Sequence, residues 1–212
     1  MTKLRAGLLI AAGIFLLVLG VAATGFYFKV YKPIAAPIMA MSFGTLLEQK
    51  QLTTHDFTKP VSGELSADQV RRFVAIEQET ETRVAGGRAV LAEQQGVLER
   101  ADVAGQLTLK TALASFGAMR PILMGAKPAQ IEAMNREHFS KAEFEWVRDQ
   151  LYRAAGIHLT RIDVSEVLSG FQDATVRVRV VSQQDAPAAN QALARPMADK
   201  LEAWRAFAFF GL

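Results

Sequence analysis

The residues of this chain best suited to acid–base or metal chemistry are three histidines and the acids near them. His55, His138 and His158 are far apart in the sequence, and none has a partner at a zinc-ligand spacing such as HExxH or ExxH. Glu137 precedes His138, but adjacent residues on a helix point about 100° apart, so the pair makes no site by itself. The chain also lacks a GxSxG serine, a P-loop and a GxGxxG motif. The sequence therefore predicts no catalytic residue, no metal, no cofactor and no enzymatic activity.

One alternative remains open, an enzyme with an unfamiliar site. A cleft in which Glu137, His138 or neighbouring acids converge with perturbed pKa values would indicate it.

The charge distribution argues against nucleic-acid binding. The chain has 24 basic and 21 acidic residues, but its first 33 residues carry four basic residues and no acid. The remainder therefore has 20 basic against 21 acidic residues, and it lacks the basic excess that a nucleic-acid interface needs. Cysteine is absent, which excludes disulfides, thiolate metal sites and a lipidated cysteine.

The N-terminal segment has the length of a membrane span. Residues 6–28 are 23 consecutive uncharged residues, enough for a helix to cross about 30 Å of hydrocarbon. Aromatic residues and lysines cluster at its distal end, as is typical of a membrane interface. We predict a tail at 1–5, a signal anchor at 6–28 in the inner membrane, and the bulk of the chain in the periplasm or outside the cell.

A cleaved signal peptide is the alternative, with the small residues ending at Ala23 as the cleavage site. If the segment stays in the membrane, Gly13, Gly20 and Thr24 are candidate contacts with another transmembrane helix, because small residues let helices approach closely. Small residues are also simply common in such helices.

After the anchor we predict a connector at 29–64 and a helical domain at 65–212. The loop-forming composition of 52–64 is typical of a linker. Ser66 and Gln69 make a capping box, and the helix that follows carries an apolar stripe that also includes Glu77 and Thr80. Gly86-Gly87 indicates a kink, a close crossing or a stop, with helix resuming toward Arg100.

Two further helices are predicted before residue 136. The spacing of apolar residues favours a helix over 102–124, ending before Gly125. Pro128 suits the first turn of a separate short helix that runs through Asn135.

The clearest local pattern is "FSKAEFEWVRDQLYRAAG", residues 139–156. Ser140 and Glu143 form a second capping box, and Gly156 fits a C-terminal cap. Trp146 lies off the apolar stripe, so it is a candidate partner contact, although a tryptophan there can equally pack within its own fold.

Residues 174–182 are open between strand and helix. Valines alternate there with Arg177 and Arg179, which gives a strand with one cationic face. Such a strand needs a partner, either residues 156–164 or a strand of another protein. The two arginines are candidate partner contacts, or simply a solvated face.

The C-terminal helix is predicted to break or restart at Pro196 and to end in an apolar run. Phe209 and Phe210 are candidate partner contacts if that end inserts into the groove of another protein. The alternative is that it docks into the bundle and closes the core.

Together, one N-terminal span, "LSADQVRRFVAI" at 65–76, "FSKAEFEWVRDQLYRA" at 139–154 and a helical end finishing in "GL" resemble a loose group of uncharacterised bacterial single-pass envelope proteins with helical domains. The resemblance implies a bacterial envelope location and a helical domain, and it transfers no active site.

The sequence thus predicts a mainly α protein: one transmembrane helix, a connector and a bundle of about five helices, with a small β element near 157–182. We expect a membrane-anchored accessory or assembly protein that binds another envelope protein and that can also form a homo-oligomer. A secreted helical protein that holds a lipid or small apolar ligand is the alternative.

Overall fold

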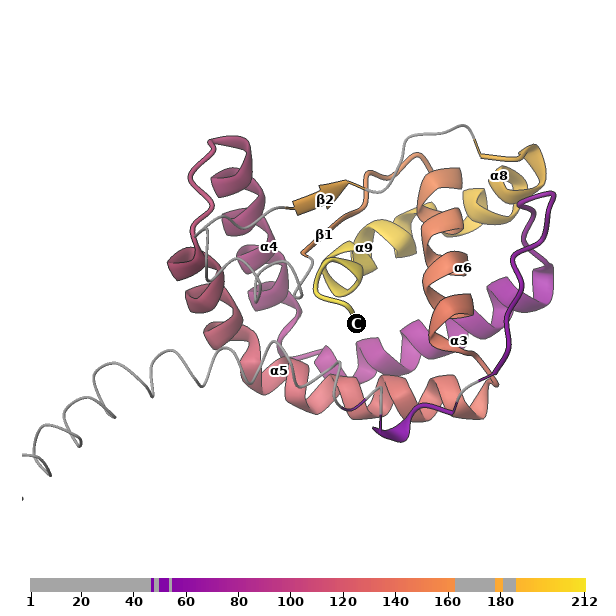
Figure 1. Ribbon diagram of the computed structural model, residues 1–212, viewed down its shortest axis with the longest axis horizontal. Coiled ribbons are helices and arrows are strands. Elements are labelled where there is room, and N and C mark those ends of the chain that lie inside the picture. Colours follow the sequence, from indigo (N-terminus) through magenta and orange to yellow (C-terminus); the bar gives the residue numbers. More distant parts are fainter. Residues whose placement is uncertain (1–46, 48–49, 54, 163–177, 181–185) are drawn as a thin grey trace, which may run out of the picture.

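The computed structural model describes residues 47, 50–53, 55–162, 178–180 and 186–212. This part of the chain is mainly helical, which confirms the mainly α part of the predicted fold (Figure 1). Within it, no helix combines the length and apolarity needed to cross a membrane. The predicted anchor at 6–28 lies outside the described residues, together with its proposed contacts Gly13, Gly20 and Thr24 and the cleavage position at Ala23.

The first two helices of the domain meet at the predicted glycine pair. α3 (Ala67–Val84) begins at the Ser66 capping box as expected, and α4 (Arg88–Val103) follows after a short turn. A Cβ placed on Gly87 would lie 2.6 Å from Ile122 Cδ1. The glycine therefore permits a close crossing between this turn and the next helix, which confirms the expectation of a stop and a close approach there.

α5 (Leu109–Arg136) corrects the prediction of two helices, because Pro121 and Pro128 both lie inside it. A proline removes one backbone donor and leaves the carbonyl four residues earlier without its helical hydrogen bond. Those carbonyls belong to Gly117 and Met124, which are both exposed, so water can satisfy them. Packing of α5 against α3 and α4 holds the helix continuous across the two prolines.

α6 (Lys141–Ala154) leads into a two-stranded sheet. β1 (Thr160–Ile162) and β2 (Val178–Val180) are antiparallel, with Arg161 opposite Arg179. The structure thus selects pairing within the chain from the alternatives that the sequence left open for 174–182. The sheet places Arg179 at the centre of β2, while Arg177 lies outside the described residues.

The C-terminal elements are α8 (Ala188–Ala194), the 3-10 turn η2 (Arg195–Met197) and α9 (Ala198–Phe209), so the chain does change direction at Pro196. In Figure 1, α9 lies in the middle of the molecule, with α4 and α6 on either side and the β-pair above it. The chain end also lies inside, since Leu212 is 1% exposed.

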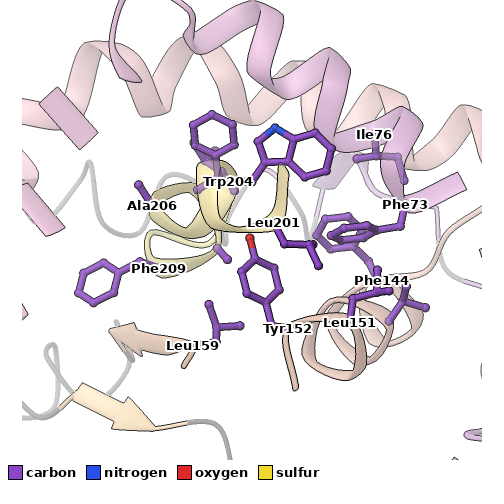
Figure 2. Packing of buried hydrophobic residues seen from close by; sticks show 14 of the residues in the cluster. Phe73, Ile76, Phe144, Leu151, Tyr152, Leu159, Leu201, Trp204, Ala206 and Phe209 are labelled. Carbon is purple, nitrogen blue, oxygen red and sulfur yellow. The ribbon is translucent and has the colours of Figure 1, made fainter. Parts of the chain in front are cut away.

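The core is built around α9. Tyr152 of α6 extends toward α9 (Figure 2), while the indole nitrogen of Trp204 on α9 donates to Glu81 Oε2 of α3 at 3.0 Å. Phe73 and Phe144 stack at 5.3 Å between ring centroids and join α3 to α6. The largest side chains that are fully buried come from α3, α4, α5, α6, α9 and the turn before α6: Phe73, Ile76, Leu91, Leu98, Met119, Ile131, Phe139, Leu151, Tyr152, Trp204, Phe207 and Phe209.

Candidate functional site

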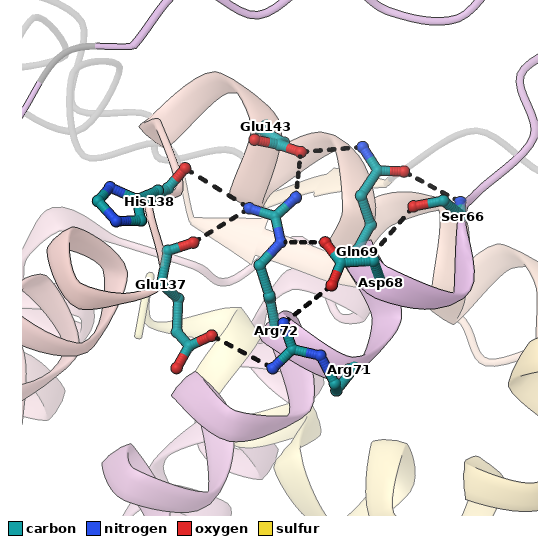
Figure 3. A network of polar contacts seen from close by, with 8 residues as sticks. All are labelled: Ser66, Asp68, Gln69, Arg71, Arg72, Glu137, His138 and Glu143. Atoms are coloured by element: carbon teal, nitrogen blue, oxygen red, sulfur yellow. Dashed lines mark hydrogen bonds and ion pairs between the residues drawn. The ribbon is translucent and has the colours of Figure 1, made fainter.

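A network of polar side chains joins the start of α3, the end of α5 and the start of α6 (Figure 3). We call it the Arg72 corner; its members are Ser66, Asp68, Gln69, Arg71, Arg72, Glu137, His138 and Glu143. The Arg72 guanidinium donates to Asp68 Oδ2 at 2.8 Å and to Glu143 Oε1 at 3.1 Å. It also lies 4.3 Å from the centre of the Phe139 ring, which is a favourable cation–π distance.

Arg72 also caps the C-terminus of α5. Its Nη1 donates to the carbonyl of Glu137 at 3.1 Å and to that of His138 at 3.5 Å. These carbonyls belong to the helix end, where acceptors lack intrahelical partners and the helix dipole is negative. A cation placed there satisfies both requirements, so one arginine of α3 fixes the position of α5 and α6 relative to its own helix.

Residues of the two predicted capping boxes belong to this corner, but only the box at α3 is complete. Ser66 and Gln69 form the complete capping box of α3. At α6, Ser140 accepts from the Glu143 amide at 3.1 Å, but the Glu143 carboxylate does not return to Ser140. It accepts instead from Gln69 Nε2 at 2.9 Å and from Arg72 at 3.1 Å, where donor and acceptor are both charged.

Asp68 is the carboxylate that joins the two arginines of the corner. Asp68 accepts from both Arg71 and Arg72, and these hydrogen bonds lower the pKa of its carboxyl. The same contact with Asp68 raises the pKa of Arg71, which also lies 3.6 Å from Glu137. Glu137 is therefore part of an ion pair rather than a lone acid beside His138.

His138 has an unusual backbone. It has φ +53° in the left-handed region, at the position just after the cap of α5. The Phe139 amide bonds to the Met134 carbonyl at 2.8 Å and the His138 amide to the Asn135 carbonyl at 3.2 Å, which is the Schellman pattern. Glycine is the usual residue there, since a side chain in this conformation costs on the order of 1 kcal/mol.

Residues 51–53 and 55–65 form a strap across the helical domain. Asn135 accepts from the Thr53 amide at 2.7 Å and donates to the Gln51 carbonyl at 2.9 Å. At the other end, the buried Asn190 accepts from the Leu65 amide at 2.7 Å and donates to the Gly63 carbonyl at 3.0 Å. Two asparagines thus bind the strap backbone as a strand partner would, and the segment is not a free linker.

Side chains of the strap also contact the domain. Phe57 meets Trp146 with ring centroids 5.4 Å apart, and His55 meets His138 edge to face at 5.8 Å. Trp146, predicted as a candidate partner contact, is 8% exposed because it packs under this strap. It therefore belongs to the protein's own interior.

A second group of ionisable side chains is buried where α3, α5 and α6 meet. Glu77 is 1% exposed and Arg148 is 2% exposed. Burial raises the pKa of Glu77 to about 8, although the cations Arg148 and Lys127 act in the opposite direction. Burial raises the pKa of Tyr152 as well, and the carboxylate of Glu77 adds to that rise.

Lys127 reaches into the same region from α5. Its Nζ donates to Gln130 Oε1 at 2.8 Å and to the carbonyl of Gly211 at 2.6 Å, so it ties α5 to the end of α9. No hydrogen-bond partner lies within reach of Glu77 Oε2, Gln130 Nε2 or Arg148 Nε among the described residues. A buried acid with a pKa near 8 is neutral at pH 7, which is the form that can tolerate this environment.

The two groups have different chemical capacities. Glu77 is in the correct range for a general acid or base, but its burial separates it from any substrate in solution. The residues of the Arg72 corner are more accessible, but most are bound to one another. In the described part of the chain, no set of three or more His, Cys, Asp or Glu side chains is grouped closely enough to hold a metal ion.

The remaining candidate contacts lie inside the protein or at its margin. Phe209 is 1% exposed in the core, so it is not available to a partner. Phe210 is partly buried and meets Phe116 at 5.9 Å between ring centroids. The apolar C-terminal run thus closes the bundle, which was the alternative to insertion into the groove of another protein.

Sequence reasoning missed two features of this site. His55 and His138 come together although 82 residues separate them in the chain, and no local pattern reports that contact. Glu77 did carry a signal, because its helical position is shared with Phe73, Thr80 and Val84 on the buried stripe. An acid on an apolar stripe is a reason to expect a buried carboxyl.

No family model matches the chain, and the curated proteins and solved structures contain no significant match to it.

Proposed function

We propose that this protein is a non-enzymatic accessory or assembly protein of the bacterial envelope. Residues 6–28 anchor it in the inner membrane, and the helical domain lies on the periplasmic side, where it binds another envelope protein. This is the function that the apolar N-terminal segment and the organisation of the domain support best.

The strap is the observation that carries this proposal. It binds the domain at Gln51 and Thr53, so only residues 29–50 separate the proposed anchor from a fixed point on the domain. Those 22 residues can span at most about 80 Å when fully extended. The domain is thereby confined near the membrane, where confinement raises the effective concentration of a partner in the same membrane.

The arrangement of the polar groups supports a binding role over catalysis. The Arg72 corner uses its charges to position three helices, and Glu77 lies out of reach of solvent. Aromatic side chains of α3, α6 and α9 fill the space between those helices, which favours this proposal over a protein that carries a ligand there (Figure 2).

The test combines fractionation with cross-linking. The full chain with a C-terminal tag is expected in the membrane pellet after alkaline extraction, at its full mass. A photo-reactive residue at Val61 or Val103, which are 108% and 89% exposed, would report a neighbouring protein. A matched probe at buried Leu201 is the control, since it can react only within the chain.

Two results bear directly on the proposal. A defined cross-linked envelope protein that is lost when residues 1–33 are removed would support it. Recovery of the chain from the soluble fraction with its first 23 residues missing would overturn the anchor and favour a secreted binding protein.

A further inference from the structure

The end of α5 has a histidine at a backbone position where three other helices have glycine. α4, α6 and α9 end in the same hydrogen-bond pattern and use glycine at the left-handed position: Gly105, Gly156 and Gly211. α5 has His138 there instead. Because glycine would relieve the strained backbone, the imidazole at this position points to a role for the side chain.

That imidazole meets a second one from the strap. The ring centroids of His55 and His138 are 5.8 Å apart, and both residues are exposed. Zn–N bonds of about 2.0–2.1 Å place two imidazoles on one tetrahedral ion with ring centres roughly 5 Å apart. The observed separation of 5.8 Å is slightly larger, and because both side chains are exposed they can approach by that amount.

The charges nearby do not oppose a cation. The Arg72 corner holds two guanidinium groups, on Arg71 and Arg72, against three carboxylates, on Asp68, Glu137 and Glu143. The charged group in contact with His138 is the Arg72 guanidinium, which donates to its carbonyl at 3.5 Å. Because the three carboxylates outnumber the two arginines that they pair with, the corner as a whole does not repel a dication.

We propose that His55 and His138 together bind a transition-metal dication of the Zn²⁺ and Cu²⁺ class. Two imidazoles supply the protein ligands, and water completes the coordination. The ion links the strap directly to the end of α5, beside the clamp that Asn135 already makes with Gln51 and Thr53. Metal binding therefore fastens the strap to the helical domain.

The test uses the full chain in mild detergent, with a tag that contains no histidine. Zn²⁺ is titrated by calorimetry, and Cu²⁺ is followed by electron spin-echo spectroscopy, which counts coordinated imidazoles. The variants are His55→Ala, His138→Gly and His138→Gln, with His158→Ala as the matched control outside the pair. His138→Gly is informative because it removes the imidazole and at the same time relieves the backbone.

The expected result is one Zn²⁺ site and a two-imidazole Cu²⁺ spectrum in the natural chain. Each variant of the pair should weaken Zn²⁺ binding about tenfold or more and leave a one-imidazole spectrum, while His158→Ala changes neither. His138→Gly should keep or raise the melting temperature of the metal-free protein, which separates metal binding from folding.

Zn²⁺ should also slow hydrogen exchange of the Thr53 amide in the natural chain and not in His55→Ala. The proposal is overturned if the natural chain binds no Zn²⁺ at 1:1 stoichiometry, or if His158→Ala weakens binding as much as the variants of the pair. Neither outcome affects the anchored location, so failure here and failure of the proposed function are distinguishable.

Discussion

Replacement of Glu77 by glutamine is expected to stabilise the protein at neutral and alkaline pH and to leave its stability in acid nearly unchanged. Glu77 lies in the interior, where burial raises its pKa from 4.5 to about 8. Glutamine has nearly the shape of the protonated acid and carries no ionisable proton. The variant therefore removes the cost of holding an acid neutral and changes the packing little.

The sign follows from proton linkage. Between pH 4.5 and about 8 the folded state keeps the proton on Glu77 and the unfolded state has lost it, so stability falls as pH rises. At 1.36 kcal/mol for each pH unit, and with both states partly titrated at the ends of this range, the loss between pH 5 and pH 8 is about 3.5 kcal/mol. The free energy of unfolding of Glu77→Gln, relative to that of the natural chain, should rise by this amount between pH 5 and pH 8. Above pH 8 the difference should stay nearly constant.

The assay is urea unfolding of the full chain in a non-ionic detergent at pH 5, 6, 7 and 8. Tryptophan fluorescence reports the transition, since Trp204 is 1% exposed in the core. Glu93→Gln is the matched control, because it removes an exposed acid of α4. The difference in free energy of unfolding between Glu93→Gln and the natural chain should not vary with pH.

The reasoning would be refuted if the difference in free energy of unfolding between Glu77→Gln and the natural chain were the same at pH 5 and at pH 8. A variant less stable than the natural chain at pH 8 would mean that Glu77 is ionised and paired with Arg148 or Lys127 in the folded state.

Three other substitutions test the packing. Gly87→Ala should lower the free energy of unfolding by about 1 to 3 kcal/mol, since the new Cβ would meet Ile122, and adding Ile122→Val should recover part of that loss in the same urea assay. Arg72→Met should lower the free energy of unfolding by about 2 to 3 kcal/mol, because it leaves the Glu143 carboxylate without its charged donor. The control is Arg100→Met, which removes an exposed arginine, and an equal effect of the two substitutions would contradict this role of Arg72. Asn190→Ala should lower the free energy of unfolding by about 1 to 3 kcal/mol, because it removes both hydrogen bonds to the strap backbone. Limited proteolysis should then cleave the strap faster, and an unchanged cleavage rate would mean that Asn190 does not hold the strap.

Local patterns in the sequence determined the helical class and several helix boundaries. The Ser66 capping box, the stop at Gly86-Gly87, the Ser140 cap and the break at Pro196 all lie where short-range chemistry placed them. These signals are readable because a cap or a break depends on backbone groups within a few residues of it.

Tertiary packing decided the features that local patterns left open or assigned differently. α5 continues through Pro121 and Pro128 because its neighbours hold it, and Phe209 lies in the core because α9 is surrounded by other elements. Glu143 turns from its own helix to Arg72 because an ionised partner lies within reach.

The strap shows the same division most clearly. Its loop composition was readable, but its docking depends on Asn135 and Asn190, and its histidine meets a residue far along the chain. A single sequence specifies which residues favour a helix, a cap or a turn. It does not state which distant side chains will be neighbours, because those contacts form only when the helices pack, and the folded arrangement alone brings His55 to His138 and places Glu77 out of water.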